Sequence, residues 1–142
     1  NVKKSFFDSL PKSAFAITNI DDKNGGFMLQ NTKAKRYSYA TKTIADYKAK
    51  VLEKQLSGSL LKVNDIEVWT KLIGGFNAYN VLAIYAVAEQ LGLQKMEILS
   101  LLSDLDSVDG RFQYFLSHNK FLYWLRNIVD VNPDKNRDIL IL

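Results

Sequence analysis

Hydrophobic and polar positions alternate with a period of two over residues 46–73, which is typical of strands with one solvated face. In the segment Tyr47-Lys48-Ala49-Lys50-Val51, lysines separate the apolar positions. Two further β-forming runs, residues 57–63 and 66–70, flank the pair Asn64-Asp65. Because Asn and Asp tolerate positive φ, this pair predicts a tight hairpin turn. The pattern therefore predicts a small antiparallel sheet, and Gly58 marks a bulge or a close backbone approach.

The residues before this sheet predict a helix and two further strands. Residues 1–10 carry an apolar face of helical spacing, and Pro11 ends the helix. Ala14 to Ile20 is a short, almost continuous apolar run, as in a parallel strand that is buried on both faces. Arg36 to Ala40 alternates and predicts another strand. The segment Lys23-Asn24-Gly25-Gly26 is expected to be a flexible connection.

The stretch from Leu72 to Gly92 predicts a long helix that begins after Gly74-Gly75 and stops at Gly92. Leu93 to Leu105 predicts a second, amphipathic helix that forms a helical hairpin with the first. A further strand is expected at 112–116. The inward positions of the two helices are expected to be Val81, Leu82, Ile84, Tyr85, Val87, Ala88 and Leu91, followed by Met96, Ile98, Leu99, Leu101, Leu102 and Leu105.

Composition narrows the classes of function. A chain of 142 residues is long enough for one core of ordinary size. With no Cys and a single His, His118, it has no disulfide framework, Cys nucleophile or Cys/His metal cluster. The net charge of +4 favours an anionic partner, although a solvated surface of mixed charge explains it as well. No apolar run reaches the length of a membrane span, so we expect a cytoplasmic protein without a membrane partner.

Polar residues suggest chemistry at two places. Asn77 and Asn80 lie three apart at a helix start, hence on one face, and an amide there can pair with the edge of an adenine ring. The alternative is that these asparagines cap the helix. Arg111, after Gly110, is placed either to reach a phosphate or to lie solvated in a turn. The polar segment 18–22, at the end of the first strand, either faces a ligand crevice or makes a turn.

These residues together resemble one family. Gly75-Phe76-Asn77-Ala78-Tyr79-Asn80 with its following helix, then Val108-Asp109-Gly110-Arg111-Phe112, is similar to the Mur ligases of peptidoglycan synthesis. Thr18-Asn19-Ile20-Asp21-Asp22 resembles the family's Asn-x-Asp-Asp segment. Phe76 favours the branch that adds the third peptide residue. The resemblance covers about residues 1–118 and implies an α/β fold: part of a central ATPase domain, with a parallel-strand remnant, a small antiparallel sheet and a helical hairpin.

The resemblance also implies chemistry. ATP would convert the terminal carboxylate of UDP-MurNAc-L-Ala-D-Glu to an acyl phosphate, which the amine of the third residue, usually meso-diaminopimelate, attacks. Asn77 and Asn80 match adenine-side asparagines of the family, and Arg111 matches its ATP-contacting arginine. Lys3 matches a lysine that is carbamylated, with Lys4 as the alternative in register. A carbamate on Lys3 would offer two oxygens to Mg²⁺.

The sequence departs from the family pattern at both ends. No Gly-Lys-Thr or Gly-Lys-Ser of a phosphate-binding loop occurs in the 142 residues, so we expect a piece of the enzyme that is inactive alone. Residues 1–118 would be the C-terminal half of the central domain, and residues 119–142 an aberrant or truncated tail. We expect a monomer without a nucleic-acid partner. The alternative is a non-catalytic basic α/β module, and the choice between diaminopimelate and lysine stays open.

Overall fold

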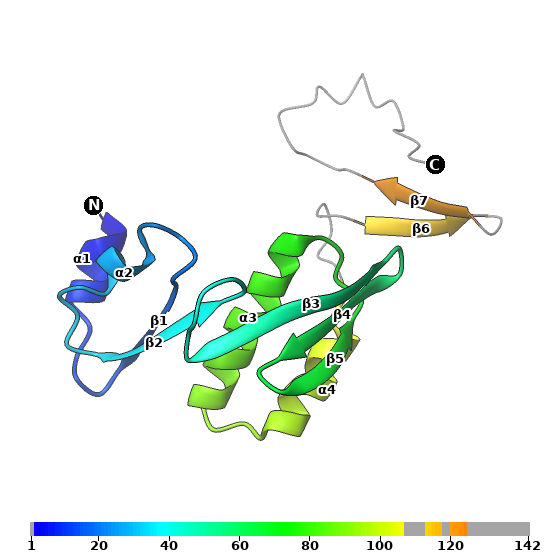
Figure 1. The fold of residues 1–142 in the computed structure, drawn as a ribbon. Helices are drawn as coiled ribbons and strands as arrows, with labels where there is room; N and C mark the ends of the chain where they lie inside the picture. The colour runs from blue at the N-terminus through cyan, green and yellow to red at the C-terminus, as the bar shows by residue number, and fades with distance from the viewer. Residues whose placement is uncertain (1, 107–112, 118–119, 125–142) are drawn as a thin grey trace.

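The computed structural model describes residues 2–106, 113–117 and 120–124, and its main feature is a five-stranded sheet (Figure 1). The strands lie in chain order, β1-β2-β3-β4-β5. The first three run parallel to one another, and the last three form antiparallel pairs. A separate antiparallel pair is formed by β6 and β7. The bounds are β1 Phe15–Asn19, β2 Lys35–Ala40, β3 Tyr47–Gln55, β4 Gly58–Val63, β5 Ile66–Thr70, β6 Gln113–Ser117 and β7 Lys120–Trp124.

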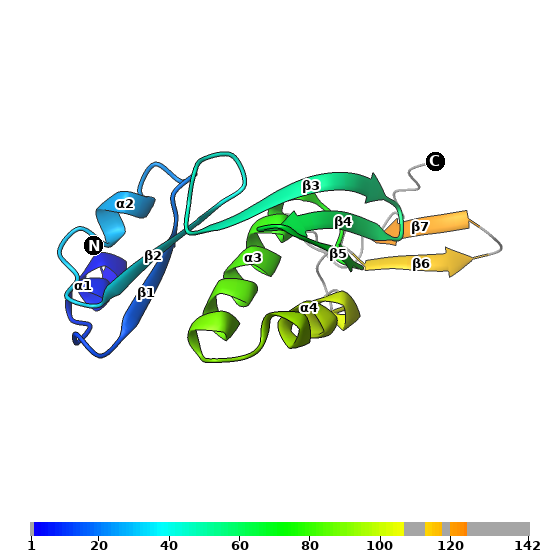
Figure 2. The same ribbon diagram turned by 60° about the horizontal axis from the view of Figure 1, so that its bottom comes forward.

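Helices cover the two faces of the sheet at different places (Figure 2). The short helices α1 (Val2–Asp8) and α2 (Gly25–Met28) lie together beside β1. The longer helices α3 (Gly75–Gln90) and α4 (Lys95–Asp104) pack under β3, β4 and β5, and α3 also reaches β1 and β2. Since neighbouring residues of a strand point to opposite faces, Ala16 of β1 packs in the α1–α2 cluster while Ile17 packs against the main core.

The predicted α/β fold class is confirmed, with one addition to the predicted sheet. The antiparallel part is continuous with the parallel strands, because β3 pairs with β2 on one side and with β4 on the other. Asn64 has φ 50°, as expected for the hairpin turn. At Gly58 a Cβ would lie 2.2 Å from the carbonyl oxygen of Thr70, so Gly58 is the site of a close approach. The register shift lies in β3 instead, between Val51 and Glu53.

Both predicted helices and their hairpin are present, but several inward positions were wrong. On α3, the buried stripe is Ala78, Val81, Leu82, Tyr85 and Ala86. Because apolar residues occur on every side of α3, apolarity alone does not identify the stripe that faces the sheet. On α4, only the stripe formed by Ile98, Leu99 and Leu102 is buried. The predicted inward residues that are exposed are Ile84, Val87, Leu91, Met96, Leu101 and Leu105.

Within the segment predicted to be a flexible connection, one residue, Gly25, is instead closely packed. Gly25 and Gly26 begin α2, and Gly25 is buried. A Cβ on Gly25 would lie 1.9 Å from the carbonyl oxygen of Asn19, whereas a Cβ on Gly26 would meet nothing within 4 Å. Gly25 therefore allows α2 to lie directly against the carboxyl end of β1.

Three tyrosines form a column between the sheet and α3, with Tyr37 on β2, Tyr47 on β3 and Tyr85 on α3. The rings of Tyr37 and Tyr47 have centroids 6.2 Å apart, and those of Tyr47 and Tyr85 are 6.1 Å apart with an edge-on geometry. The hydroxyl of Tyr47 accepts a 2.6 Å hydrogen bond from Gln90 Nε2. Burial raises the pKa of Tyr47 to about 12; the Gln90 hydrogen bond opposes this rise and the negative charge of Glu89 adds to it. The column joins the sheet to the C-terminal turns of α3.

Candidate functional site

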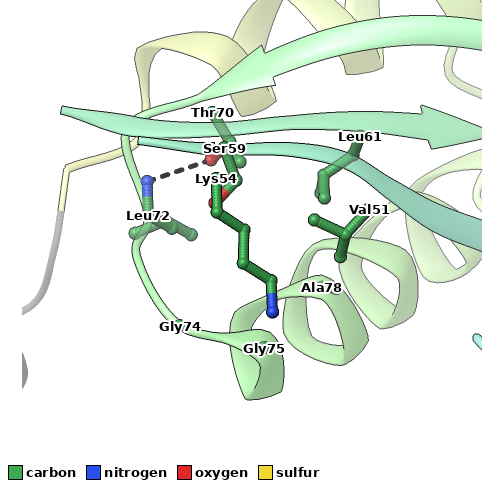
Figure 3. A pocket seen from close by; sticks show the side chains of 9 residues that line it. All are labelled: Val51, Lys54, Ser59, Leu61, Thr70, Leu72, Gly74, Gly75 and Ala78. Carbon is green, nitrogen blue, oxygen red and sulfur yellow. Dashed lines mark hydrogen bonds between the residues drawn. The ribbon is translucent and has the colours of Figure 1, made fainter. Parts of the chain in front are cut away.

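The candidate site begins at the turn between β5 and α3. Gly74 has φ 98°, a conformation that favours glycine, and α3 starts at Gly75. Beside this turn is a shallow pocket (Figure 3), into which Lys54 extends from β3 toward Gly75. One hydrogen bond braces its wall, from Leu72 N to Thr70 Oγ1 at 3.2 Å. The lining residues are Val51, Lys54, Ser59, Leu61, Thr70, Leu72, Gly74, Gly75 and Ala78.

Asn77 and Asn80 are brought together on one face of α3, as the spacing predicts. Asn77 Nδ2 donates a 2.6 Å hydrogen bond to the carbonyl oxygen of Ile73. Asn80 Nδ2 in turn donates to Asn77 Oδ1 at 3.0 Å. The amide of Asn77 is thus held between two partners, and it fixes the orientation of the Asn80 amide.

The capping alternative for these asparagines is wrong. The residue that caps α3 is Gly74, and no side chain makes the capping hydrogen bond. Asn77 does not satisfy an orphan backbone N–H, since its Nδ2 donates to a backbone carbonyl. Asn80 is exposed, and within the described part of the chain its Oδ1 accepts no hydrogen bond. Asn80 therefore presents an oriented amide, with an acceptor and a second N–H, to whatever lies beside the helix.

Asp21, which follows β1 after Ile20, connects three segments. Its Oδ1 accepts hydrogen bonds from the backbone N–H of Thr43 at 2.9 Å and from Thr43 Oγ1 at 2.6 Å. Its Oδ2 accepts from the N–H groups of Thr41 and Lys42 at 2.7 and 2.9 Å, and from Thr41 Oγ1 at 3.3 Å. The hydroxyl of Tyr79 on α3 also donates to Oδ2, at 2.9 Å. The carboxylate thus joins the end of β1, the loop after β2 and the second turn of α3.

These donors also determine the charge state of Asp21. Burial by itself would raise the pKa of Asp21, but the hydrogen bonds from Thr43, Thr41, Lys42 and Tyr79 outweigh it and hold the pKa well below its ordinary value. Asp21 is therefore an anion at neutral pH. The turn alternative for this segment is supported, because Asp21 N donates to Asn19 Oδ1 at 3.0 Å and Asn24 N donates to Asp22 Oδ1 at 2.8 Å. The ligand crevice stays a prediction.

The two lysines at the N-terminus differ in their surroundings. Lys4 Nζ pairs with Asp8 at 2.9 and 3.1 Å and lies 5.1 Å from the centre of the Phe27 ring. A carbamate on Lys4 would replace this cation with an anion beside the Asp8 carboxylate, which is electrostatically unfavourable. Lys3 is exposed on the same helix. Its predicted role stays a prediction.

Two further predictions concern Arg111 and a metal ion. Arg111 lies outside the described residues. Over residues 2–106, 113–117 and 120–124, no group of three or more His, Cys, Asp or Glu side chains is placed to hold a metal ion. Since Mg²⁺ is commonly held by one or two carboxylates together with water and phosphate oxygens, the predicted metal role of Lys3 stays a prediction. Within the same part of the chain, no helix is long and apolar enough to cross a membrane.

Sequence reasoning missed Tyr79 and the loop 41–43 as parts of this region. Tyr79 was within the recognised motif, but its hydroxyl reaches a partner 58 positions away in the chain. An Asp immediately after a parallel strand, followed later by Thr-Lys-Thr after the neighbouring strand, is the available sequence signal. It indicates only that the two loops share one edge of the sheet.

The fold and the site define an α/β domain in which polar side chains gather at the carboxyl ends of parallel strands, as in nucleotide-binding domains. Comparison with known proteins narrows the class. Residues 1–88 match the model of the Mur ligase middle domain. The chain belongs to the Mur ligase family, and the part matched is the middle, or central, domain.

Several curated relatives carry the same enzyme name. The chain is 52% identical over 111 residues to the UDP-N-acetylmuramoyl-L-alanyl-D-glutamate--2,6-diaminopimelate ligase of Parabacteroides distasonis, covering 78% of this chain and 23% of that protein. It is 43% identical over 140 residues to the ligase of the same name from Cytophaga hutchinsonii, covering 97% and 28%. The second match therefore runs into the residues after 118. The chain spans about a quarter of the length of these relatives.

Solved structures support the same fold. A structure of UDP-N-acetylmuramoyl-L-alanyl-D-glutamate--2,6-diaminopimelate ligase superposes with a TM-score of 0.74, at 24% identity, over 85% of this chain and 27% of that one. At this identity the likeness concerns the fold alone. The predicted division at residue 118 stays a prediction, and the β6–β7 hairpin falls across it.

Proposed function

We propose that this chain is part of an ATP-dependent ligase that joins the third peptide residue, meso-diaminopimelate or lysine, to UDP-MurNAc-L-Ala-D-Glu. The observation that carries the proposal is the 52% identity to a relative named for ligation of 2,6-diaminopimelate. The cytoplasmic location and the monomeric state stay predictions of the sequence.

The proposed reaction has two steps. An oxygen of the substrate's terminal carboxylate attacks the γ-phosphorus of ATP, which forms an acyl phosphate and releases ADP. The neutral amine of the incoming residue then attacks the acyl carbon, and the C–O bond to phosphate breaks. The products are an amide, inorganic phosphate and the proton lost by the amine. Mg²⁺, when bound with ATP, neutralises phosphate charge.

In this proposal the described residues supply one wall of the ATP site. Asn80 presents its amide to the adenine edge, where its Oδ1 accepts from the exocyclic amino group and its free N–H donates to a ring nitrogen. Asn77 keeps that amide in place through its bonds to Ile73 and Asn80. Arg111 contacts the phosphates of ATP.

Lys3 is proposed to carry a carbamate, formed by addition of CO₂ to its neutral amine with loss of one proton. The carbamate would offer two anionic oxygens near the phosphates. A carbamate on Lys4 would place an anion beside the Asp8 carboxylate, with which Lys4 forms an ion pair, and this disfavours Lys4 as the modified residue. Mass spectrometry after rapid trapping of the carbamate by alkylation should find the modification on the peptide that contains Lys3.

The test is amide formation by the full-length polypeptide that carries this chain. With ATP, Mg²⁺, UDP-MurNAc-L-Ala-D-Glu and either diaminopimelate or lysine, we expect one UDP-MurNAc-tripeptide, one ADP and one phosphate per turnover. Hydroxylamine added without the amine should trap the acyl phosphate as a hydroxamate. Absence of any tripeptide with both amines would refute the proposal.

The isolated 142-residue chain is expected to release no phosphate from ATP in the same assay. It contains no phosphate-binding Gly-Lys-Thr or Gly-Lys-Ser, so it cannot hold the phosphates by that loop. ATP turnover by the isolated chain would contradict this part of the proposal. Tight, salt-sensitive binding of nucleic acid would favour the alternative of a basic binding module.

A further inference from the structure

Asp21 lies at the junction of three segments that are far apart in sequence. Its own backbone N–H donates to Asn19 Oδ1 at 3.0 Å, so the residue is fixed at the end of β1. Its two carboxylate oxygens accept six hydrogen bonds, from Thr41, Lys42, Thr43 and Tyr79. Because hydrogen bonds to an ionised carboxylate are strong and directional, this group has one well-defined position.

Of these four partners, only Tyr79 belongs to α3, and it lies in the same turn of the helix as the two asparagines of the site. Tyr79 lies between Asn77 and Asn80, and its hydroxyl donates to Asp21 Oδ2 at 2.9 Å. The helix begins after Gly74, at which the backbone has φ 98°. Since a helical turn moves as a unit, the Tyr79 hydroxyl fixes the distance of the Asn80 amide from the end of β1.

We propose that Asp21 is a positioning residue for the adenine-recognising amide of Asn80, acting through Tyr79 and the loop 41–43. The inference rests on the proposed function, because it assigns Asn80 to ATP. Asp21 does not touch the nucleotide. Its carboxylate holds the loop 41–43 and the start of α3 in one arrangement, in which the Asn77–Asn80 pair is ready for adenine.

A matched control is available in the same loop. Asp46 also accepts two hydrogen bonds through its carboxylate, from Ser38 N at 2.8 Å and from Ser38 Oγ at 2.7 Å. These bonds connect the loop to β2 and not to α3. Asp46→Asn therefore perturbs the same connection between β2 and β3, while it leaves the bonds of Asp21 to loop 41–43 and to Tyr79 in place.

The experiment measures steady-state kinetics of amide formation by the full-length polypeptide. Tyr79→Phe is expected to raise KM for ATP about tenfold, the effect of losing one hydrogen bond to a charged group. Asp21→Asn should raise it at least as much, because it weakens all six bonds to the carboxylate. The values of kcat and of KM for the UDP substrate should change by less than about twofold, since neither residue contacts the reacting atoms. The double variant should equal Asp21→Asn, because both changes break the same connection. Asp46→Asn should leave KM for ATP unchanged.

An Asp21→Asn protein with the ATP KM of Asp46→Asn would overturn the inference, as would a fall in kcat at constant KM for ATP. If Asp21→Asn does not fold, Tyr79→Phe alone decides, because it removes only one hydroxyl. A wild-type protein that forms no amide would refute the proposed function itself. An active wild type with unchanged KM in both variants would refute only the role of Asp21.

Discussion

Gly25 offers a sharp test of the packing that places the end of β1. A Cβ on Gly25 would lie 1.9 Å from Asn19 O, 2.9 Å from the carbonyl carbon of Asn19 and 3.1 Å from Thr18 Oγ1. Real Cβ atoms essentially never approach below 3.0 Å, so Gly25→Ala requires α2 and β1 to separate by 3.0 − 1.9 = 1.1 Å. Two of the close atoms belong to the backbone, so a change of rotamer cannot relieve the clash.

The cost follows from the contacts that such a separation breaks. Thr18 Oγ1 donates to Gly25 O at 3.0 Å, and Gly25 N donates to Asp22 O at 2.9 Å. The first bond would exceed hydrogen-bond distance, and the second would be strained. Losing one or two such bonds costs about 1–2 kcal/mol, and overpacking adds about 1–3 kcal/mol. We therefore expect Gly25→Ala to lower the free energy of unfolding by about 3 kcal/mol.

The measurement is urea unfolding of the 142-residue chain, followed by circular dichroism, for Gly25→Ala and for Gly26→Ala. The second variant is the matched control, because its Cβ meets nothing within 4 Å and it lies in the same helix. Ala favours a helix over Gly, so Gly26→Ala should be neutral or stabilising by up to about 1 kcal/mol. Equal stability of the two variants would refute the close approach of α2 to β1.

Three further predictions concern the site and the tyrosine column. Asn80→Ala should raise KM for ATP in the full-length polypeptide and change the free energy of unfolding by less than about 0.5 kcal/mol, because Asn80 is exposed. Asn77→Ala should raise the same KM and also lower the free energy of unfolding by about 1–2 kcal/mol, because it removes two hydrogen bonds. A KM unchanged in both variants would remove these asparagines from the site. The pKa of Asp21 is lowered from 3.8, so the stabilisation that its carboxylate provides is present above about pH 4 and is lost as the pH falls further. The free energy of unfolding in urea should therefore change less between pH 6 and pH 3 for Asp21→Asn than for wild type. Equal changes in the two proteins would contradict the lowered pKa of Asp21. Because burial raises the pKa of Tyr47 from 10.0 to about 12, the stabilisation that this tyrosine provides is complete below pH 10 and is lost as the pH rises toward 12. In an ultraviolet titration of the wild type, Tyr47 should ionise near pH 12, and this step should be missing in Tyr47→Phe. An unchanged titration curve would assign the step to another tyrosine.

Patterns with one clear solvated face were predictable from the sequence. In β3, buried Tyr47 and Ala49 alternate with exposed Lys48 and Lys50, so the pattern identifies both the strand and its inner face. Asn64 marked the hairpin for a local reason, since few residues tolerate its φ of 50°. The alternation in β3 and the turn at Asn64 depend only on residues that are neighbours in sequence, so they can be identified without knowledge of the fold.

Features that depend on distant partners were not predictable. The exposed Ile84 is as apolar as the buried Leu82, and only the position of the sheet decides which one is covered. The sequence suggested a flexible segment at Gly25, because the local residues do not reveal that Asn19 O lies close to it. This close approach arises from the packing of α2 on β1. In the site, the spacing of Asn77 and Asn80 predicted a shared face, but the choice between capping and an oriented amide required the geometry of Ile73 O.

The central claim is that the start of α3 forms the adenine side of an ATP site, and a crystal structure of the full-length polypeptide with Mg-ADP tests it most directly. The exocyclic amino group of adenine is expected within about 3 Å of Asn80 Oδ1. The hydrogen bonds of Asn77 to Ile73 O and of Tyr79 to Asp21 should both be retained. Adenine bound elsewhere, with the Asn80 amide facing solvent, would contradict it.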